Sequence, residues 1–197
     1  MTEREKMLAG VIYNSDVQEL REARMRAKIL CRKFNDLSPA DEQGRIAVLR
    51  ELIGKTSDNI WVEQPFLCDY GENIEVGNNF YANYNLVVLD CAKVTIGDNV
   101  FIAPNVGIYT AAHPIIASQR NIRGMEFAAP ITIGNNVWIG GGVQICPGVV
   151  IGDNTVIGAG SVVSKDIPSN VVAAGVPCRV LREITDDDLL ELDAGEV

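Results

Sequence analysis

The chain has 197 residues, of which 47% are hydrophobic and 22% charged, and its formal net charge at pH 7 is −9. This length fits one globular domain with an appendage. No apolar run approaches the roughly 18 residues of a membrane-spanning helix, and the charged N-terminus gives no reason to expect a signal peptide. Because affinity for nucleic acid depends on Lys and Arg at phosphates, the acidic balance argues against a nucleic-acid partner.

The cysteines favour a reducing compartment. Their number, five, is odd, and their spacing contains neither a CxxC pair nor a zinc-type pattern. They are Cys31, Cys68, Cys91, Cys146 and Cys178. We therefore expect free thiols in a cytoplasmic protein, and we interpret Cys146 and Cys178 as packing residues.

The distribution of charge divides the chain into three segments. Residues 1–57 hold 11 of the 17 basic residues, whereas residues 58–182 form a long apolar and glycine-rich tract with few charges. Residues 183–197 add acidic side chains and no basic one, which is typical of a solvated end. These boundaries predict a helical segment, a main domain and an acidic tail.

The first segment has the spacing of two amphipathic helices. Across residues 16–34, apolar side chains recur three or four positions apart. We expect Asp16 to cap this helix, with Glu19 completing a capping box. A second helix is predicted over residues 41–53, ending at Gly54. Because two short helices cannot bury a core alone, this segment should pack on the main domain.

The main domain repeats every six residues. Over residues 133–163 an aliphatic residue recurs at every sixth position, and a small residue follows it in most of the hexads. The same frame occupies residues 76–88 and, after a two-residue slip, residues 96–108. An α-helix needs a period near 3.6 and a two-faced strand a period of 2, so neither explains a period of six.

A period of six fits a prism built from three short parallel strands per coil, or about 18 residues per turn. One aliphatic side chain on each face would point inward, and the small residue beside it would ease the corner, where Gly and Asn tolerate unusual backbone angles. Each coil would hydrogen-bond to the next at the ordinary strand spacing of about 4.8 Å. The predicted fold class is therefore mainly β, a parallel β-helix of hexapeptide repeats behind an N-terminal helical segment.

One stretch, residues 109–130, interrupts the period. It contains His113, the only histidine of the chain, followed by Pro114. Loops of about 20 residues inside a regular repeat are usually functional, so we expect this excursion to carry part of the active site.

Longer motifs surround these features. They are FYANYN (80–85), IGDNVFIAPNV (96–106), His113-Pro114, PITIGNNVWIGGGV (130–143), PGVVIGDNTVIGAGSVVSKDIP (147–168) and VVAAGVPCRVLREI (171–184). Together with the N-terminal GVIYNSDVQELREARMRAKILCRKFN, they closely resemble the sugar O-acetyltransferases of the galactoside and maltose acetyltransferase group. The resemblance covers nearly the whole chain.

This resemblance implies a left-handed coil, although the usual crossover rule predicts a right-handed one. It also implies a homotrimer with each active site between two subunits, and acetyl-CoA as co-substrate without a catalytic metal. The implied reaction transfers an acetyl group to a hydroxyl of a galactoside, maltose or glucose type of sugar, by direct attack in a ternary complex.

Acetyl transfer from a thioester to a hydroxyl needs a base for the alcohol proton, and an imidazole suits that task near neutral pH. We assign this role to His113, which matches the family's catalytic histidine. The matching Asn83 is implied to orient the acceptor and steady the tetrahedral intermediate, although it could instead be a corner residue in a left-handed conformation. A covalent acyl-enzyme would need an activated Cys or Ser, and no cysteine adjoins His113 in sequence.

The resemblance also implies where the acceptor binds. Asp16, Arg24, Asp69 and Asn83 fall at positions that contact the sugar in the family. For Asp16 a helix cap is the competing interpretation. Where the galactoside branch has an acidic sugar ligand, this chain has Cys91, so the identity of the acceptor is open.

Coenzyme A presents a pantetheine arm and a phosphorylated nucleotide. Gly141, Ala159 and Ser164 match pantetheine-contacting positions of the family. Trp138 is large for a solenoid corner, and we expect it to project toward either a neighbouring subunit or the coenzyme. Three of the six basic residues after position 57 lie near the last coil and are candidates for phosphate binding. They are Lys165, Arg179 and Arg182.

Three other classes of protein compete with this interpretation. A carbonic anhydrase on the same repeat needs three histidines per zinc, which a chain with one histidine could supply only on a threefold axis. A non-catalytic scaffold would be expected to lack either the histidine or the cationic end. An antibiotic or other small-molecule hydroxyl acetyltransferase shares the repeat but lacks the helical segment, which therefore favours sugars.

Overall fold

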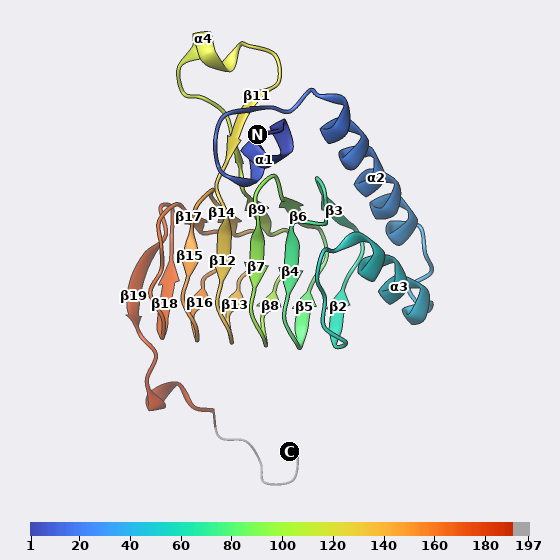
Figure 1. The fold of residues 1–197 in the computed structure, drawn as a ribbon. Helices are drawn as coiled ribbons and strands as arrows, with labels where there is room; N and C mark the ends of the chain where they lie inside the picture. Colours follow the sequence, from blue (N-terminus) through green and yellow to red (C-terminus); the bar gives the residue numbers. More distant parts are fainter. Residues whose placement is uncertain (191–197) are drawn as a thin grey trace.

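The computed structural model describes residues 1–190, so the last seven residues of the predicted acidic tail lie outside the described residues (Figure 1). Parallel strands stack into three sheets that form the sides of a β-helix. The first face holds β4 (Ile74–Val76), β7 (Val94–Ile96), β12 (Ile131–Ile133) and β15 (Val150–Ile151). The second holds β2 (Ile60–Val62), β5 (Phe80–Ala82), β8 (Phe101–Ile102), β13 (Trp138–Ile139), β16 (Val156–Ile157), β18 (Val171–Ala174) and the antiparallel β19 (Arg179–Glu183). The third holds β3 (Phe66–Cys68), β6 (Leu86–Leu89), β9 (Gly107–Tyr109), β14 (Gln144–Ile145) and β17 (Val162–Val163).

The six-residue repeat supplies the core of this β-helix. The repeated aliphatic positions of residues 76–88, 96–108 and 133–163 are all buried, none of them more than 4% exposed. Burying a large aliphatic side chain contributes about 1.5–3 kcal/mol, so the stacked rows account for much of the stability of the coil. The predicted parallel β-helix of hexapeptide repeats is confirmed.

The glycines that follow the buried aliphatic residues are not required for the unusual backbone angles that the sequence suggested. Gly134, Gly140, Gly152 and Gly158 do not have positive φ angles. Instead they lie close to the next coil: a Cβ atom on Gly140 would be 2.6 Å from the Ala159 backbone nitrogen. Other corner residues have the positive φ angles, namely Asn79, Asn85, Asn99, Asn105, Asn136, Asn154 and Asn170, and Gly142, Gly148 and Gly160.

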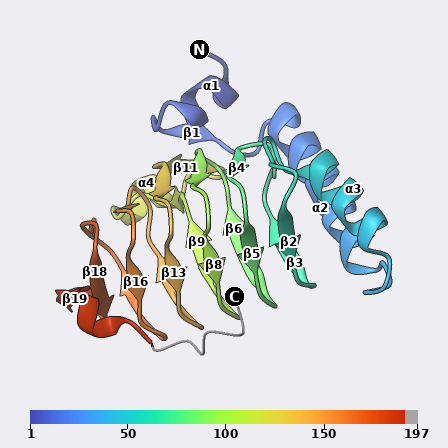
Figure 2. The same cartoon turned by 90° about the horizontal axis from the view of Figure 1, so that it is seen from below.

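The helical segment covers one end of the stack. It comprises α1 (Glu3–Leu8), α2 (Gln18–Asn35) and α3 (Glu42–Leu52), of which α1 was not expected from the sequence. Leu30 and Phe34 of α2, with Leu49 of α3, join the same core cluster as the strands. Figures 1 and 2 both place α2 and α3 beside β2 and β3, with β19 at the opposite end.

The one cap predicted from the sequence is not formed, although α3 has a side-chain cap of its own. Asp41 caps α3 as its N-cap residue, accepting a hydrogen bond from the Gly44 backbone nitrogen at 3.0 Å. The prediction for α2 is wrong, because its N-cap is Val17 and no side chain caps it. Asp16 therefore does not act as a cap, and Glu19 completes no capping box.

The excursion leaves the β-helix after β9 and forms its own small structure. It contains β10 (Ala111–Ala112), α4 (Ala117–Arg120) and β11 (Met125–Ala128). β11 pairs antiparallel with β10 on one side and with β1 (Tyr13–Asn14) of the N-terminal segment on the other. Between β19 and residue 190, where the described part of the chain ends, lies a 3₁₀ turn, η1 (Asp186–Asp188).

Candidate active site

Extra residues accumulate at one corner of the β-helix. In the early coils Ile74 pairs with Val94, twenty residues later, whereas in the late coils Thr132 pairs with Val150, only eighteen later. The two extra residues fall between a third-face strand and the next first-face strand. Residues 69–73 and 90–93 occupy this corner in successive coils, and the excursion leaves from the same place one coil later. We call residues 69–73, 90–93 and 110–130 the insertion corner.

The N-terminal segment closes over the insertion corner. Tyr13 and Asn14 pair with Glu126 and Met125 of β11, and the Ser15 backbone nitrogen donates to the Gly124 carbonyl at 2.7 Å. A second apolar cluster forms beneath this contact. It contains Met7, Tyr13, Leu20, Tyr70, Cys91, Ala92 and Ala128. The predicted acceptor residues of the helical segment are thereby brought to the same corner as Asp69.

Arg24 is held in place by the insertion corner. Its Nη1 atom donates to the Tyr70 hydroxyl at 2.6 Å and its Nη2 atom to the Ser15 carbonyl at 2.7 Å. Burial works against its charge, but Tyr70, Glu126 and Asp69 together raise the pKa of Arg24. Arg24 is therefore a fixed cation among polar groups.

Asp69 and Cys91 lie in contact. The Cys91 thiol donates to Asp69 Oδ2, with 3.5 Å between sulfur and oxygen. Burial raises the pKa of Asp69, and it likewise raises the pKa of Asp90, to about 6. The fully buried Asp90 accepts hydrogen bonds from the backbone nitrogens of Asp69 and Tyr70 at 3.1 and 2.8 Å, so it fixes the turn that presents Asp69. Apart from the two-residue slip in the repeat, no pattern in the sequence indicates this positioning role of Asp90.

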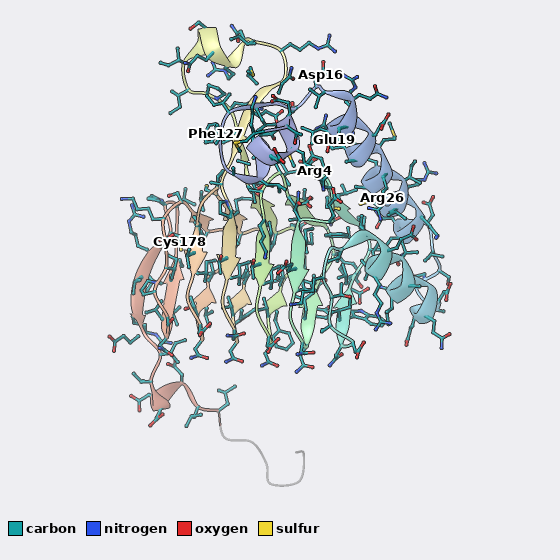
Figure 3. All side chains as sticks on the ribbon, in the orientation of Figure 1. Arg4, Asp16, Glu19, Arg26, Phe127 and Cys178 are labelled. Carbon is teal, nitrogen blue, oxygen red and sulfur yellow. The ribbon has the colours of Figure 1, made fainter. Side chains whose placement is uncertain are left out.

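Asp16 lies at the start of α2, facing the excursion (Figure 3). Its carboxylate pairs with Arg21 at 3.0 Å and with Arg123 of the excursion at 2.7 Å. The hydrogen bond from Arg21, with the charge of Arg123, lowers the pKa of Asp16 although burial opposes this. Asp16 therefore ties the helical segment to the excursion.

His113 directly follows β10 and is exposed to solvent. The β10–β11 ladder ends at the pair Ala112 and Phe127, so His113 lies one residue beyond it, at the level of Glu126. His113 therefore belongs to the insertion corner, as Asp69 does.

Asn83 lies at a different corner, where second-face strands lead into third-face strands. Its φ angle is not positive, whereas that of Asn85 is, so the left-handed interpretation of Asn83 is wrong. Its Oδ1 atom accepts a hydrogen bond from the Tyr84 backbone nitrogen at 2.7 Å. Asn83 lines a surface groove of about 400 Å³. The other lining residues are Tyr81, Phe101, Ile102, Ala103 and Trp138.

Small residues continue along this groove corner. The Gly142 backbone nitrogen donates to the Pro104 carbonyl at 2.9 Å, and the Gly160 nitrogen to the Gly141 carbonyl at 2.8 Å. Gly141 and Ala159 therefore stack in successive coils beyond Asn83. Trp138 is on strand β13 instead of at a corner, and its outward-facing side chain is 56% exposed.

The remaining predicted coenzyme residues lie elsewhere. Ser164 and Lys165 follow β17, at the far end of the third-face strands from Ala159, and both are exposed. Arg179 and Arg182 are exposed on β19. Arg182 forms two hydrogen bonds, at 2.7 and 2.6 Å, with the Asp188 carboxylate.

One chain does not bring Asn83 and His113 together. Asn83 precedes β6 and His113 follows β9, and these strands are parallel neighbours on the third face. The two residues therefore lie at opposite ends of the strands, and the four residues of β6 alone span roughly 10 Å.

Two further findings concern residues 1–190. No three His, Cys, Asp or Glu side chains in this described part of the chain are grouped as a metal site would require. No helix formed by these residues has both the length and the apolar character needed to cross a membrane.

Comparison with known proteins agrees with this architecture. Residues 6–57 match the maltose acetyltransferase hexapeptide capping motif, and residues 130–165 match the bacterial transferase hexapeptide. A putative acetyltransferase of Saccharomyces cerevisiae is 59% identical over 93% of this chain and 94% of its own.

Two solved structures are similar over nearly their whole length. A maltose O-acetyltransferase from Clostridium difficile 630 has a TM-score of 0.93 and 54% identity, covering 94% of this chain and 99% of that one. A galactoside acetyltransferase in complex with coenzyme A has a TM-score of 0.92 and 51% identity, covering 95% and 94%. The chain therefore belongs to the hexapeptide-repeat acetyltransferases of the galactoside and maltose O-acetyltransferase group.

Proposed function

We propose that this acetyltransferase moves an acetyl group from acetyl-CoA to a hydroxyl of a sugar of the galactoside, maltose or glucose type. The observation that carries the proposal is the insertion corner, which contains the exposed His113 and Asp69 and to which Arg24 is hydrogen-bonded through Tyr70. Such groups suit an acceptor with several hydroxyls. The names of the two similar structures, a maltose and a galactoside acetyltransferase, support the same class of acceptor.

In the proposed reaction, His113 takes the proton of the acceptor hydroxyl as its oxygen attacks the acetyl carbonyl carbon. The new carbon–oxygen bond forms the ester, the carbon–sulfur bond breaks, and the leaving thiolate recovers the proton from the imidazolium. Asn83 would orient the acceptor and donate to the oxyanion that develops on the carbonyl. Direct attack in a ternary complex needs no covalent enzyme intermediate.

The position of Asn83 supports an active site shared between subunits. Since Asn83 and His113 lie at opposite ends of the third-face strands, each could meet its counterpart from a second chain at a subunit boundary. Gly141 and Ala159 at the groove corner, and Ser164 and Lys165 at the other end of the strands, would likewise line one coenzyme path from two chains.

We therefore expect a homotrimer. The outward aromatic row of the second face, which includes Tyr81, Phe101 and Trp138, gives it an apolar surface to cover. Sedimentation equilibrium should give about three times the chain mass of 21.4 kDa. A mass near that of one chain at working concentration would contradict the shared site.

Cations near the last coil are proposed to bind the phosphates of coenzyme A. Lys165 and Arg179 have no acidic partner within 4 Å among residues 1–190, whereas Arg182 is already paired with Asp188. The double variant Lys165→Ala/Arg179→Ala should raise the acetyl-CoA KM by roughly 5- to 150-fold, equivalent to about 1–3 kcal/mol, and by less at high salt. If the folded double variant kept the wild-type acetyl-CoA KM, Lys165 and Arg179 would not bind the coenzyme phosphates.

An acceptor screen tests the substrate class. Released thiol would be followed with acetyl-CoA and galactosides, maltose, glucose or antibiotics. We expect sugars to be preferred, because the helical segment that carries Asp16 and Arg24 is the part that antibiotic acetyltransferases lack. Preference for an antibiotic would replace the sugar proposal with the second candidate. The cytoplasmic location stays a prediction from the cysteines.

A further inference from the structure

Two cysteines lie in contact where the helical segment packs on the β-helix. Cys31 is on α2 and Cys68 is the last residue of β3, so the pair joins the helical segment to the third face. Their sulfur atoms are 3.6 Å apart, although the two residues are 37 positions apart in the chain. Figures 1 and 2 both show α2 beside β3 at this end of the stack.

The two thiols are chemically unequal, although both are buried in the same core cluster. The hydrogen bond with Cys68 lowers the pKa of the Cys31 thiol in spite of its burial. The same hydrogen bond and burial raise the pKa of the Cys68 thiol, and the charges of Asp90 and Asp69 add to this effect. Cys31 therefore ionises more readily, and the thiolate is the form of cysteine that reacts with oxidants.

A bond between these sulfur atoms needs little rearrangement of the fold. A disulfide bond is about 2.05 Å long, so the two atoms would approach each other by about 1.5 Å from their present distance of 3.6 Å. Because Cys68 ends β3 and leads into residues 69–73 of the insertion corner, side-chain rotation and a small shift of the strand end supply this approach.

We propose that Cys31 and Cys68 form a reversible oxidation site, at which hydrogen peroxide converts the two thiols to a disulfide that ties α2 to β3 and stabilises the fold. The Cys31 thiolate attacks one peroxide oxygen, the oxygen–oxygen bond breaks, and the released hydroxide takes up the thiol proton to form water. The Cys68 sulfur then attacks the sulfur of the resulting sulfenic acid, and the hydroxyl leaves with the Cys68 proton as a second water. The two sulfur atoms lose two electrons, which the peroxide gains.

Burial of the pair favours a disulfide over further oxidation. Peroxide is nearly as small as water, so small movements of α2 against β3 admit it where a larger oxidant is excluded. The sulfenic acid then has the Cys68 sulfur already in contact, so the disulfide forms before a second peroxide reacts. The bond closes a long loop of the chain, and it joins the helix that carries Arg24 to the strand that Asp69 follows.

Thiol counting and peptide mapping test the site in the wild-type protein. After treatment with hydrogen peroxide, removal of the excess with catalase, denaturation and alkylation, the number of free thiols should fall from five to three. Dithiothreitol should restore all five. Trypsin places Cys31 in residues 29–32, and both Cys68 and Cys91 in residues 56–93, so fragment ions must identify the cysteine that is bonded to Cys31. The melting temperature should rise by roughly 5–10 °C, because the closed loop restricts the unfolded chain.

Single variants assign the rise in melting temperature to this pair. Cys31→Ala and Cys68→Ala should each abolish the rise, whereas the matched control Cys146→Ala, which removes a more exposed cysteine, should keep it and lose two of its four thiols. Five free thiols in the treated wild type would overturn the proposal, and so would a bond from Cys31 to Cys91, an unchanged melting temperature of the oxidised protein, or a rise that persists in Cys31→Ala. The wild-type peptide map decides the outcome even if an alanine variant fails to fold.

Discussion

Replacing His113 by alanine should lower kcat by roughly 10²- to 10⁴-fold, the usual contribution of a positioned acid–base catalyst. The side chain is exposed at the end of β10, outside the repeat, so its loss removes the base without disturbing the core. The acetyl-CoA KM should change little, because other residues hold the coenzyme. Initial rates at saturating acetyl-CoA with a sugar acceptor that the wild type uses would measure the effect.

The variant Asn83→Ala should be compared with His113→Ala in the same assay. It removes an orienting group and one hydrogen bond but leaves the base, so its loss of kcat should be smaller. Thermal unfolding should match the wild type for His113→Ala. If a folded His113→Ala enzyme kept more than about a third of the wild-type kcat, His113 would not be the general base.

Replacing Gly141 by leucine should lower kcat/KM for acetyl-CoA by about 100-fold, because overpacking a fitted site costs a few kcal/mol. The fold has room for this side chain: a Cβ atom on Gly141 would meet only the Pro104 carbonyl, at 3.4 Å, and the φ angle is not positive. The leucine would therefore extend from the groove corner into the proposed path of the pantetheine arm. Steady-state kinetics with varied acetyl-CoA would measure the loss.

The neighbouring Gly140 provides the contrasting variant. There a Cβ atom would lie 2.6 Å from the Ala159 nitrogen and 2.8 Å from the Ile157 carbonyl oxygen, both backbone atoms of the next coil. Gly140→Leu should therefore destabilise the fold by about 3 kcal/mol or more. If Gly141→Leu kept wild-type acetyl-CoA kinetics with an intact fold, the coenzyme path would not pass this residue.

The repeat could be predicted from sequence because it is local and strict. Every sixth residue meets the same environment, so burial of positions such as Ile133 and Ile139 follows from spacing alone. The helices over 16–34 and 41–53 were placed to within two residues by the same kind of periodicity. The excursion was located because it breaks the period.

Caps and corners were less predictable because each depends on atoms distant in sequence. Asp16 is a residue type that often caps helices, and it lies just before α2. Its side chain is held instead by the ion pair with Arg123 of the excursion. From the sequence, Gly140 is expected to provide an unusual backbone angle. In the structure glycine is required because the Ala159 backbone of the next coil, 19 residues on, leaves no room for a Cβ atom.

The sequence by itself determined the parallel β-helix, the helical segment beside it and the candidate status of His113, since these depend on periodicity and on a single histidine. Only the tertiary structure decided that the two-residue slips and the excursion stack at one corner, that Cys31 of α2 meets Cys68 of β3, and that Asn83 lies at the opposite ends of the strands. The physical reason is that parallel coils bring together residues about 20 positions apart, so a site at a corner is defined by register between coils and not by the order of residues along the chain.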